Sequence, residues 1–124
     1  MGHKDDKREK LPQDRHGITR KVNACGLEFY LTINFYAKSG LPAEMFIRIA
    51  KEGSTIAGFF ECFAITVSIA WQYGVPWEVL FDKYVNQIFE PRDDINSSLI
   101  HAIGMEVTSI IKLWQEIQNG PNKI

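Results

Sequence analysis

The clearest alternation of apolar and polar residues runs through LEFYLTINFY, Leu27 to Tyr36. Its odd-numbered positions are all apolar, and its even-numbered positions include Thr32 and Asn34. A period of two is typical of a strand with one buried face. The segments ITRKVNAC before it and EMFIRIAK after it also alternate, and Gly26 predicts a tight hairpin at the first junction. The pattern predicts three antiparallel strands.

The period changes at Ser54. The following segment, STIAGFFECFAITVSIAWQYG, is apolar almost all the way round and contains no turn signal before Gly74. A helix that is apolar on every side is typical of a buried helix. Gly74 suits the left-handed position after a last helical turn, and Pro76 suits the first turn of a second helix, PWEVLFDKYVNQI.

Irregular chain separates this second helix from a third one. In FEPRDDINSS, Pro91 disfavours continuation of a helix, and either Asn96 or Ser97 suits the cap of the next one. The third helix has regularly spaced apolar residues and ends before NGP, at Asn119. The sequence therefore predicts the α+β class, with an N-terminal antiparallel sheet of about three strands and about three C-terminal helices packed on one face.

Length and charge narrow the picture further. The chain has 124 residues, 45% of them apolar, which predicts one soluble domain. We expect a mobile arm over residues 1–14, a single α+β domain over 15–119 and a short tail over 120–124. A net charge of -1 offers no general attraction for DNA or RNA duplexes or for an anionic membrane. No run of about 18 apolar residues is apparent that would cross a bilayer.

Cysteine usage points to a reducing compartment. Cys25 and Cys62 stand 37 positions apart without a CxxC pair, so we expect neither a zinc site nor a disulfide, and no cofactor. No apolar segment follows the first charges in the manner of a secretory signal. These features favour a cytoplasmic protein.

One face of the predicted sheet carries many aromatic residues. The positions that point away from the helices are Tyr30, Thr32, Asn34, Tyr36, Phe46 and Arg48. Two interpretations remain open. They are scattered surface aromatics, which are common, or they form a self-association face or ligand platform.

The stretch AKEGSTI, Ala50 to Ile56, joins the last strand to the long helix. The first N–H groups of a helix lack partners and lie at the positive end of its dipole, which favours phosphate or carboxylate there. Lys51 adds a positive charge. The alternative is that Ser54 or Thr55 simply caps the helix, which is the more frequent use of these residues.

The stretch FEPRDDIN, Phe89 to Asn96, combines groups that suit a nucleotide. Phe89 is able to stack on a base, Arg92 to form a fork on phosphate, and Asn96 to bond ribose hydroxyls. The alternative is a solvated loop that only joins two helices.

Catalytic signatures are scarce. His16 and His101 lie beside no recognisable nucleophile, and the sequence contains no GxSxG, HExxH or EF-hand pattern. Glu61 is an unusual carboxylate within an apolar helix. One interpretation is that Glu61 has a raised pKa and acts as an acid. The other is a side chain that is hydrogen-bonded or exposed at a rim.

The assembled pieces resemble a known family. The chain resembles the C-terminal TSCPD-type domain of adenosylcobalamin-dependent ribonucleotide reductases, which also occurs as small stand-alone phage proteins. The resemblance rests on four segments: RHGITRKVNACGLEFYLTINFY, GLPAEMFIRIAKEGSTIAGFFECFA, SIAWQYGVPWEVLFDKY and FEP. The likeness covers about residues 15 to 114, and AKEGST, QYGVP and FEP are its most specific parts. It implies that the reductase's catalytic barrel, radical-forming cysteines and cobalamin site lie outside this domain. We therefore expect a protein that is not an enzyme. The family tends to have a Gly soon after FEP where this chain has Arg92-Asp93-Asp94, which implies a ligand preference of its own.

Small phage proteins that resemble this chain act as so-called sponges, which means that they bind cyclic ADP-ribose or cyclic oligonucleotide immune signals without degrading them. The resemblance, the two polar loops and the scarcity of catalytic groups favour a non-catalytic binding protein of this anti-Thoeris or anti-CBASS type, active in the host cytosol. The alternative is a stand-alone accessory domain of a ribonucleotide reductase, and a third class is an enzyme built on Glu61 or His101. Mixing the protein with such nucleotides and heating it to release unchanged ligand tests the first hypothesis.

The sponge hypothesis comes with named contacts. The expected ligand-binding residues are Lys51, Gly53, Ser54, Thr55, Phe89, Arg92 and Asn96. Tight capture without chemistry needs an enclosed site, so we expect pockets at a subunit boundary and a homo-oligomer, a dimer or higher.

Overall fold

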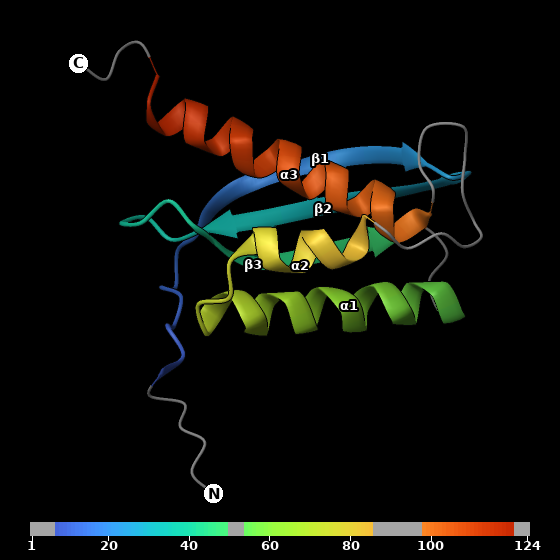
Figure 1. The fold of residues 1–124 in the computed structure, drawn as a ribbon, viewed down its shortest axis with the longest axis horizontal. Coiled ribbons are helices and arrows are strands. Elements are labelled where there is room, and N and C mark those ends of the chain that lie inside the picture. Colours follow the sequence, from blue (N-terminus) through green and yellow to red (C-terminus); the bar gives the residue numbers. More distant parts are fainter. Residues whose placement is uncertain (1–6, 50–53, 86–97, 121–124) are drawn as a thin grey trace, which may run out of the picture.

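The computed structural model describes residues 7–49, 54–85 and 98–120. Three strands come first, and three helices follow them (Figure 1). The elements are β1 (His16–Ala24), β2 (Leu27–Phe35), β3 (Pro42–Ile49), α1 (Thr55–Gln72), α2 (Trp77–Tyr84) and α3 (Leu99–Gln118). This arrangement confirms the predicted α+β class.

The sheet has the order β1-β2-β3, and both pairs are antiparallel. The predicted hairpin turns at Cys25 and Gly26, whose φ angles are 53° and 79°. Positive φ at both central residues is typical of the two-residue turns that match the twist of the flanking strands. The register places Phe29 opposite Val22 on β1 and opposite Ile49 on β3, so the apolar positions of all three strands share one face.

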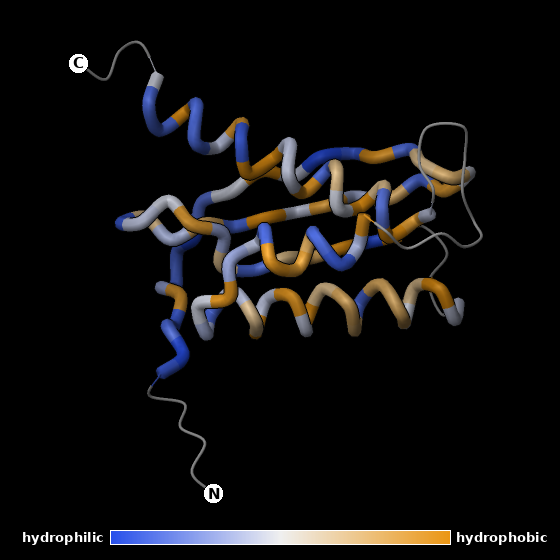
Figure 2. The backbone as a smooth tube through the Cα atoms, viewed as in Figure 1, coloured by the Kyte–Doolittle hydropathy of each residue, from blue (hydrophilic) through white to orange (hydrophobic). Residues whose placement is uncertain are grey.

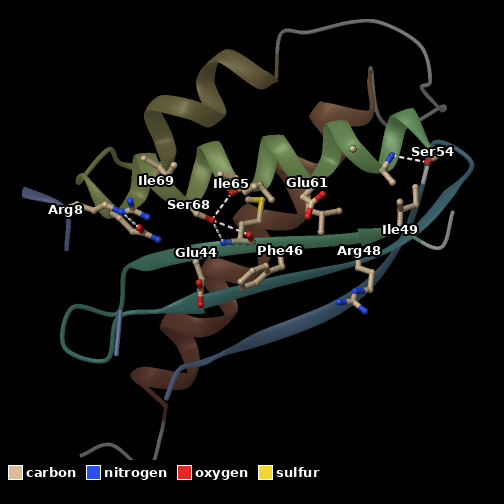
Figure 3. A pocket seen from close by; sticks show the side chains of 16 residues that line it. Arg8, Glu44, Phe46, Arg48, Ile49, Ser54, Glu61, Ile65, Ser68 and Ile69 are labelled. Atoms are coloured by element: carbon tan, nitrogen blue, oxygen red, sulfur yellow. Dashed lines mark hydrogen bonds between the residues drawn. The ribbon is translucent and has the colours of Figure 1, made fainter. Parts of the chain in front are cut away.

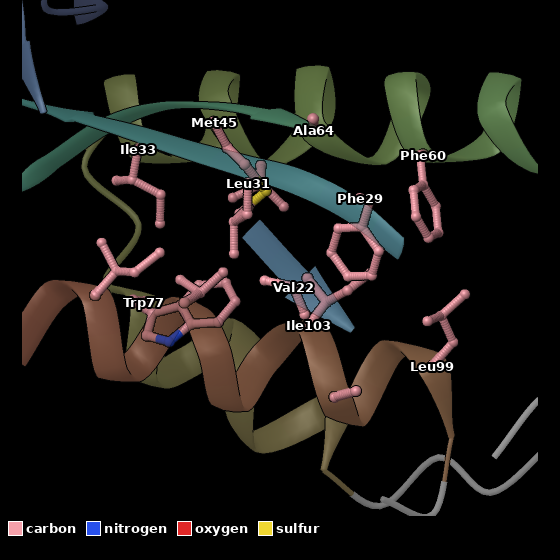
Figure 4. Packing of buried hydrophobic residues seen from close by; sticks show 14 of the residues in the cluster. Val22, Phe29, Leu31, Ile33, Met45, Phe60, Ala64, Trp77, Leu99 and Ile103 are labelled. Carbon is pink, nitrogen blue, oxygen red and sulfur yellow. The ribbon is translucent and has the colours of Figure 1, made fainter. Parts of the chain in front are cut away.

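The core lies between this apolar face and the helices (Figure 4). The ring of Phe60 from α1 meets Phe29 edge-on, with centroids 5.3 Å apart. The fully buried large side chains come from β2, β3, α1 and α3: Phe29, Leu31, Ile33, Met45, Val67, Ile103, Val107 and Ile110.

The short helix α2 joins the two long helices. Trp77 packs edge-on against Trp71 of α1, with ring centroids 5.7 Å apart. Its indole Nε1 donates a hydrogen bond to Thr108 Oγ1 of α3 at 2.9 Å. Because one side chain contacts both long helices, α2 sets their spacing at this end of the core.

The described part of the N-terminal arm contacts the fold. Glu9 N donates to Gln72 O at 2.8 Å, and Arg8 Nε donates to Gln72 Oε1 at 2.6 Å. Tyr36 Oη donates to Glu9 O at 2.7 Å. These contacts hold Arg8 and Glu9 against the end of α1, and Tyr36 is buried instead of lying on the exposed sheet face as predicted.

Two expectations about the helices need correction. The helix α1 is not buried on every side: only 33% of it is buried, and Phe59 is 71% exposed. The cap of α3 is Ser98, whose Oγ accepts a bond from His101 N at 3.1 Å, whereas the predicted caps, Asn96 and Ser97, lie outside the described residues.

By length and composition, α1 is also apolar enough to cross a membrane, contrary to the expectation that no such run exists. This is weak evidence for a membrane span, because a core helix of a soluble protein passes the same test. Here the buried side of α1, including Phe60, Val67 and Trp71, belongs to the hydrophobic core.

Candidate functional site: a groove between the sheet edge and α1

The helix α1 runs along the edge of β3 that faces away from β2. Met45 N donates to Ser68 Oγ at 2.8 Å, and Gln72 Nε2 donates to Ala43 O at 3.0 Å. An edge strand presents backbone N–H and C=O groups that need partners. The side chains of Ser68 and Gln72 supply partners to two residues of this edge.

Sequence reasoning missed this role, although a signal was present. In a mostly apolar helix, Glu61, Ser68 and Gln72 recur at intervals of seven and four. These spacings place the three polar side chains on one side of a helix. Ala57 and Ala64 lie on the same side and leave room for the strand. A polar stripe on an apolar helix is therefore a signal for contact with a sheet edge.

A groove of about 790 Å³ follows this contact on the open side of the sheet (Figure 3). Glu44, Phe46 and Arg48 from β3 line one wall. Gly58, Glu61, Ile65 and Ile69 from α1 line the other, with Ser54 and Arg8 also among the lining residues. The groove is thus polar at several points and has an apolar helix wall.

Several polar groups of the groove already have structural partners. Arg15 Nη1 donates to both carboxylate oxygens of Glu44, at 2.8 and 2.9 Å. Asn34 Nδ2 donates to Glu44 Oε2 at 2.7 Å, and Arg8 is bonded to Gln72. These interactions fasten the sheet and the arm, so the carboxylate of Glu44 already has three hydrogen bonds within the fold.

Shifted pKa values lie away from the groove. Burial raises the pKa of Tyr36 and of Tyr84, and the hydrogen bond that Lys21 donates to Glu28 raises the pKa of Lys21. None of these three residues lines the groove. Among the described residues, no group of three or more His, Cys, Asp or Glu side chains is arranged to hold a metal. Among its described lining residues, the groove therefore offers contact surface and no evident acid–base pair.

The catalytic candidates are separated. Glu61 is exposed on the rim of the groove, which agrees with the second interpretation of this residue. His101 lies half-buried in the first turn of α3, and His16 is exposed at the start of β1.

The open face of the sheet is mostly a set of polar pairs. Lys21 Nζ lies 2.6 Å from Glu28 Oε2, and the hydroxyls of Thr19 and Thr32 are hydrogen-bonded at 2.7 Å. Phe46 is exposed beside the groove. Cross-strand polar pairs are typical of a solvated face, so they favour the interpretation of scattered surface aromatics over a platform.

Most of the predicted ligand contacts fall outside the described residues, namely Lys51, Gly53, Phe89, Arg92 and Asn96. Ser54 caps α1, since its Oγ accepts a bond from Ala57 N at 3.1 Å, and it also lines the groove. Thr55 is the exposed first residue of α1. The predicted cap is present, and the anion site stays a prediction.

Comparisons with known proteins agree with one another. A family model described as the TSCPD domain matches residues 3–122. The "Vitamin B12-dependent ribonucleotide reductase" of Rhodopirellula baltica is 43% identical over 108 residues, which cover 87% of this chain and 10% of that protein. Proteins of the same name from Streptantibioticus cattleyicolor and Streptomyces clavuligerus are 45% identical over 84 residues, which cover 68% of this chain and 14% and 9% of theirs. This chain therefore spans only a small part, 9 to 14%, of the length of these curated relatives. No solved structure matches.

Proposed function

Because this chain belongs to the TSCPD family, we propose that it is an accessory module of a vitamin B12-dependent ribonucleotide reductase, which binds the catalytic chain without carrying out the reaction itself. The observation that carries the proposal is the match of 87% of this chain to 10% of the Rhodopirellula baltica reductase. So small a share of a large enzyme is the scale of one domain.

The chemistry of the described residues supports a binding role. Glu44 and Arg8, which line the groove, are engaged in bonds that hold the sheet and the arm together. Exposed apolar side chains, including Phe46 and Ile65, stand along the same groove. Side chains of this kind contribute to association with other proteins more readily than to proton or electron transfer.

The test uses the Rhodopirellula baltica reductase without the segment that matches this chain. We expect this protein, supplied separately, to bind the shortened reductase in a pull-down and to restore part of its ribonucleotide reduction with adenosylcobalamin. The reductase's own excised segment, supplied in the same way, is the matched control. If that segment binds and restores activity while this chain does neither, the proposal is wrong.

Fewer observations support the sponge hypothesis. The relatives are named as reductases, and none of their names concerns sequestration of a nucleotide. Ser54 and Thr55 are the only predicted contacts within the described part of the chain. The hypothesis stays a prediction, to be tested by nucleotide release on heating.

A further inference from the structure

The edge of the sheet formed by β1 lies opposite the edge that α1 covers, because the strand order is β1-β2-β3 (Figure 1). The strand β1 pairs with β2 over all nine of its residues in an unshifted register, and it contains no proline. Figure 2 shows a hydrophilic stretch in the middle of β1, in contrast to the largely apolar α1. Bulges, prolines and covering helices are common means of closing a sheet edge, and β1 has neither a bulge nor a proline.

The register shows which backbone groups of β1 point out of the sheet. Met45 N donates to Ser68 Oγ outside the sheet, so Met45 and the opposite residue, Ile33, form a pair without hydrogen bonds between them. The backbone groups of Ile33 therefore point to its other neighbour, Ile18 on β1. Since these directions alternate along a strand, the outward groups of β1 belong to every second residue: Gly17, Thr19, Lys21 and Asn23.

These four residues form a row of unpaired backbone groups, and all four are exposed. Within the part of the chain that the structure describes, none of their N–H or C=O groups has a hydrogen-bond partner, whereas Ser68 and Gln72 supply partners to the β3 edge. The row extends for about 20 Å, at roughly 3.4 Å per residue. An extended chain presents donors and acceptors at the same spacing, so it is the ligand that this row matches.

The charge of β1 narrows the choice of that chain. The strand contains Arg20 and Lys21 and no Asp or Glu. Among the described residues, the hydrogen bonds of Arg20 involve Nη1 alone, so its remaining donors are available to a carboxylate. Lys21 is exposed beside its partner Glu28. A neighbouring strand that carries acidic residues therefore complements β1.

We propose that β1 is a docking edge for an extended acidic segment of the reductase's catalytic chain, which adds to the sheet as a fourth strand. This inference rests on the proposed function and names the chemistry of the contact. Backbone hydrogen bonds to the outward row provide affinity in strand addition, and the side chains beside the row select the segment.

A second copy of β1 is a poorer occupant of this edge. Two antiparallel copies paired about their centres would bring Arg20 and Lys21 close to the same cations of the other copy. Like charges on neighbouring strands are destabilising, and cations on an edge strand are a common device against self-pairing. The same cations favour a partner of opposite charge.

The first experiment measures hydrogen exchange at single amides of this chain, alone and bound to the shortened Rhodopirellula baltica reductase. In the free chain, the outward amides of Thr19 and Lys21 should exchange quickly, and the inward amides of Arg20 and Val22 slowly. Binding should slow the outward amides at least about 10-fold. Slow outward amides in the free chain would overturn the proposal, because the chain itself would then cover the edge. Protection confined to β3 and α1 would also overturn it and assign binding to the groove.

A pair of substitutions removes one outward donor. Thr19→Pro lacks the N–H and leaves the hydrogen bonds to β2 intact, because proline is tolerated on an edge strand where its N–H would face outward. Thr19→Val keeps the N–H and removes only the hydroxyl. The proline variant should bind the shortened reductase at least about 10-fold more weakly than the valine variant. If Thr19→Pro does not fold, Asn23→Pro and Asn23→Thr replace the pair. Equal binding within the pair that folds would overturn the proposal.

A charge exchange tests the acidic partner. Lys21→Glu combined with Glu28→Lys retains an ion pair between the strands and places a negative charge on the edge. Lys112→Glu combined with Glu116→Lys is the matched control, because it exchanges two exposed charges on α3. The exchange on β1 should weaken binding at least about 10-fold, and the exchange on α3 should leave it close to wild type. Equal binding of the two would overturn the acidic segment.

The two proposals fail in different ways. A wild-type chain that does not bind the shortened reductase would overturn both the proposed function and the docking edge. A wild-type chain that binds while the outward amides of β1 still exchange quickly would overturn the docking edge alone.

Discussion

The two long helices of this fold are similar in length and differ in how their apolar and polar residues are distributed. The helix α3, of 20 residues, covers the face of the sheet with six buried residues, and it carries Glu106, Lys112 and Glu116 outside that stripe. The helix α1, of 18 residues, covers the edge of the sheet with Ser68 and Gln72 and leaves apolar side chains exposed.

This difference follows from what each helix has to cover. A sheet face presents apolar side chains, so a helix packed on it needs one apolar stripe and can be polar elsewhere. A sheet edge presents N–H and C=O groups, so a helix packed beside it needs polar side chains on the contact side. The apolar residues of α1 are then divided between the core and the exposed side of the helix.

The largest contrast is expected from one substitution made on both helices. Ile110 in α3 is fully buried, so Ile110→Ala should lower the free energy of unfolding by about 2–5 kcal/mol through lost burial and a cavity. Ile65 in α1 is 53% exposed, so Ile65→Ala should change it by less than about 0.5 kcal/mol. Urea unfolding at low protein concentration measures both. Equal losses would mean that the two helices do not differ in the way described.

The glycines of the two helices provide a second contrast. A Cβ added at Gly104 would lie 2.8 Å from Cδ1 and Cε1 of Phe81 on α2, so Gly104→Ala should destabilise the fold by about 1–3 kcal/mol. A Cβ at Gly58 meets nothing within 4 Å, so Gly58→Ala should stabilise the folded chain by about 0.5–1 kcal/mol. Thermal unfolding followed by circular dichroism should show shifts of opposite sign. A Gly104→Ala protein as stable as the wild type would show that α2 and α3 are not in close contact.

The hydrogen bonds at the edge are the next effect in size. Ser68→Ala removes the partner of Met45 N and should cost about 1–2 kcal/mol, because a buried donor is left without a bond. Thr66→Ala is the matched control, since its hydroxyl bonds only to Cys62 O within the same helix. Hydrogen exchange should show faster exchange of the Met45 amide in Ser68→Ala alone. Unchanged exchange there would mean that α1 does not protect the edge.

The strands and the helix limits could be predicted because their signals are local. Alternation over a few residues predicts a strand, and Gly74 and Pro76 mark the end of one helix and the start of the next. Each signal depends on neighbours in the sequence. The edge contact is different, because Gln72 and Ala43 are 29 residues apart and no local pattern names the partner.

Burial was harder to predict than the elements themselves. The alternation of the strand predicts that Tyr36 is exposed, yet its side chain is buried. Its hydroxyl donates a hydrogen bond to the backbone carbonyl of Glu9, which lies 27 residues earlier. Hydropathy alone predicts that an apolar helix such as α1 is buried on all sides. Hydropathy does not indicate which sides of the helix the rest of the chain covers. Of the candidate site, the sequence anticipated the cap at Ser54 and missed Ser68 and Gln72.

The smallest contrast concerns the caps of the two helices. Ser98 Oγ accepts from His101 N and Ser54 Oγ accepts from Ala57 N, both at 3.1 Å, but Ser98 is fully buried and Ser54 is not. Removing either cap by substitution with Ala should cost about 0.5–2 kcal/mol, with Ser98→Ala near the upper end because no water can replace its oxygen. Ser54→Asn and Ser98→Asn retain a capping oxygen. Ser54→Asn should therefore stay close to wild-type stability in urea, whereas the buried Ser98 site has less room for the larger side chain. If Ser54→Ala lowered stability more than Ser98→Ala, Ser54 would have to stabilise the start of α1 through a contact other than its hydrogen bond to Ala57 N.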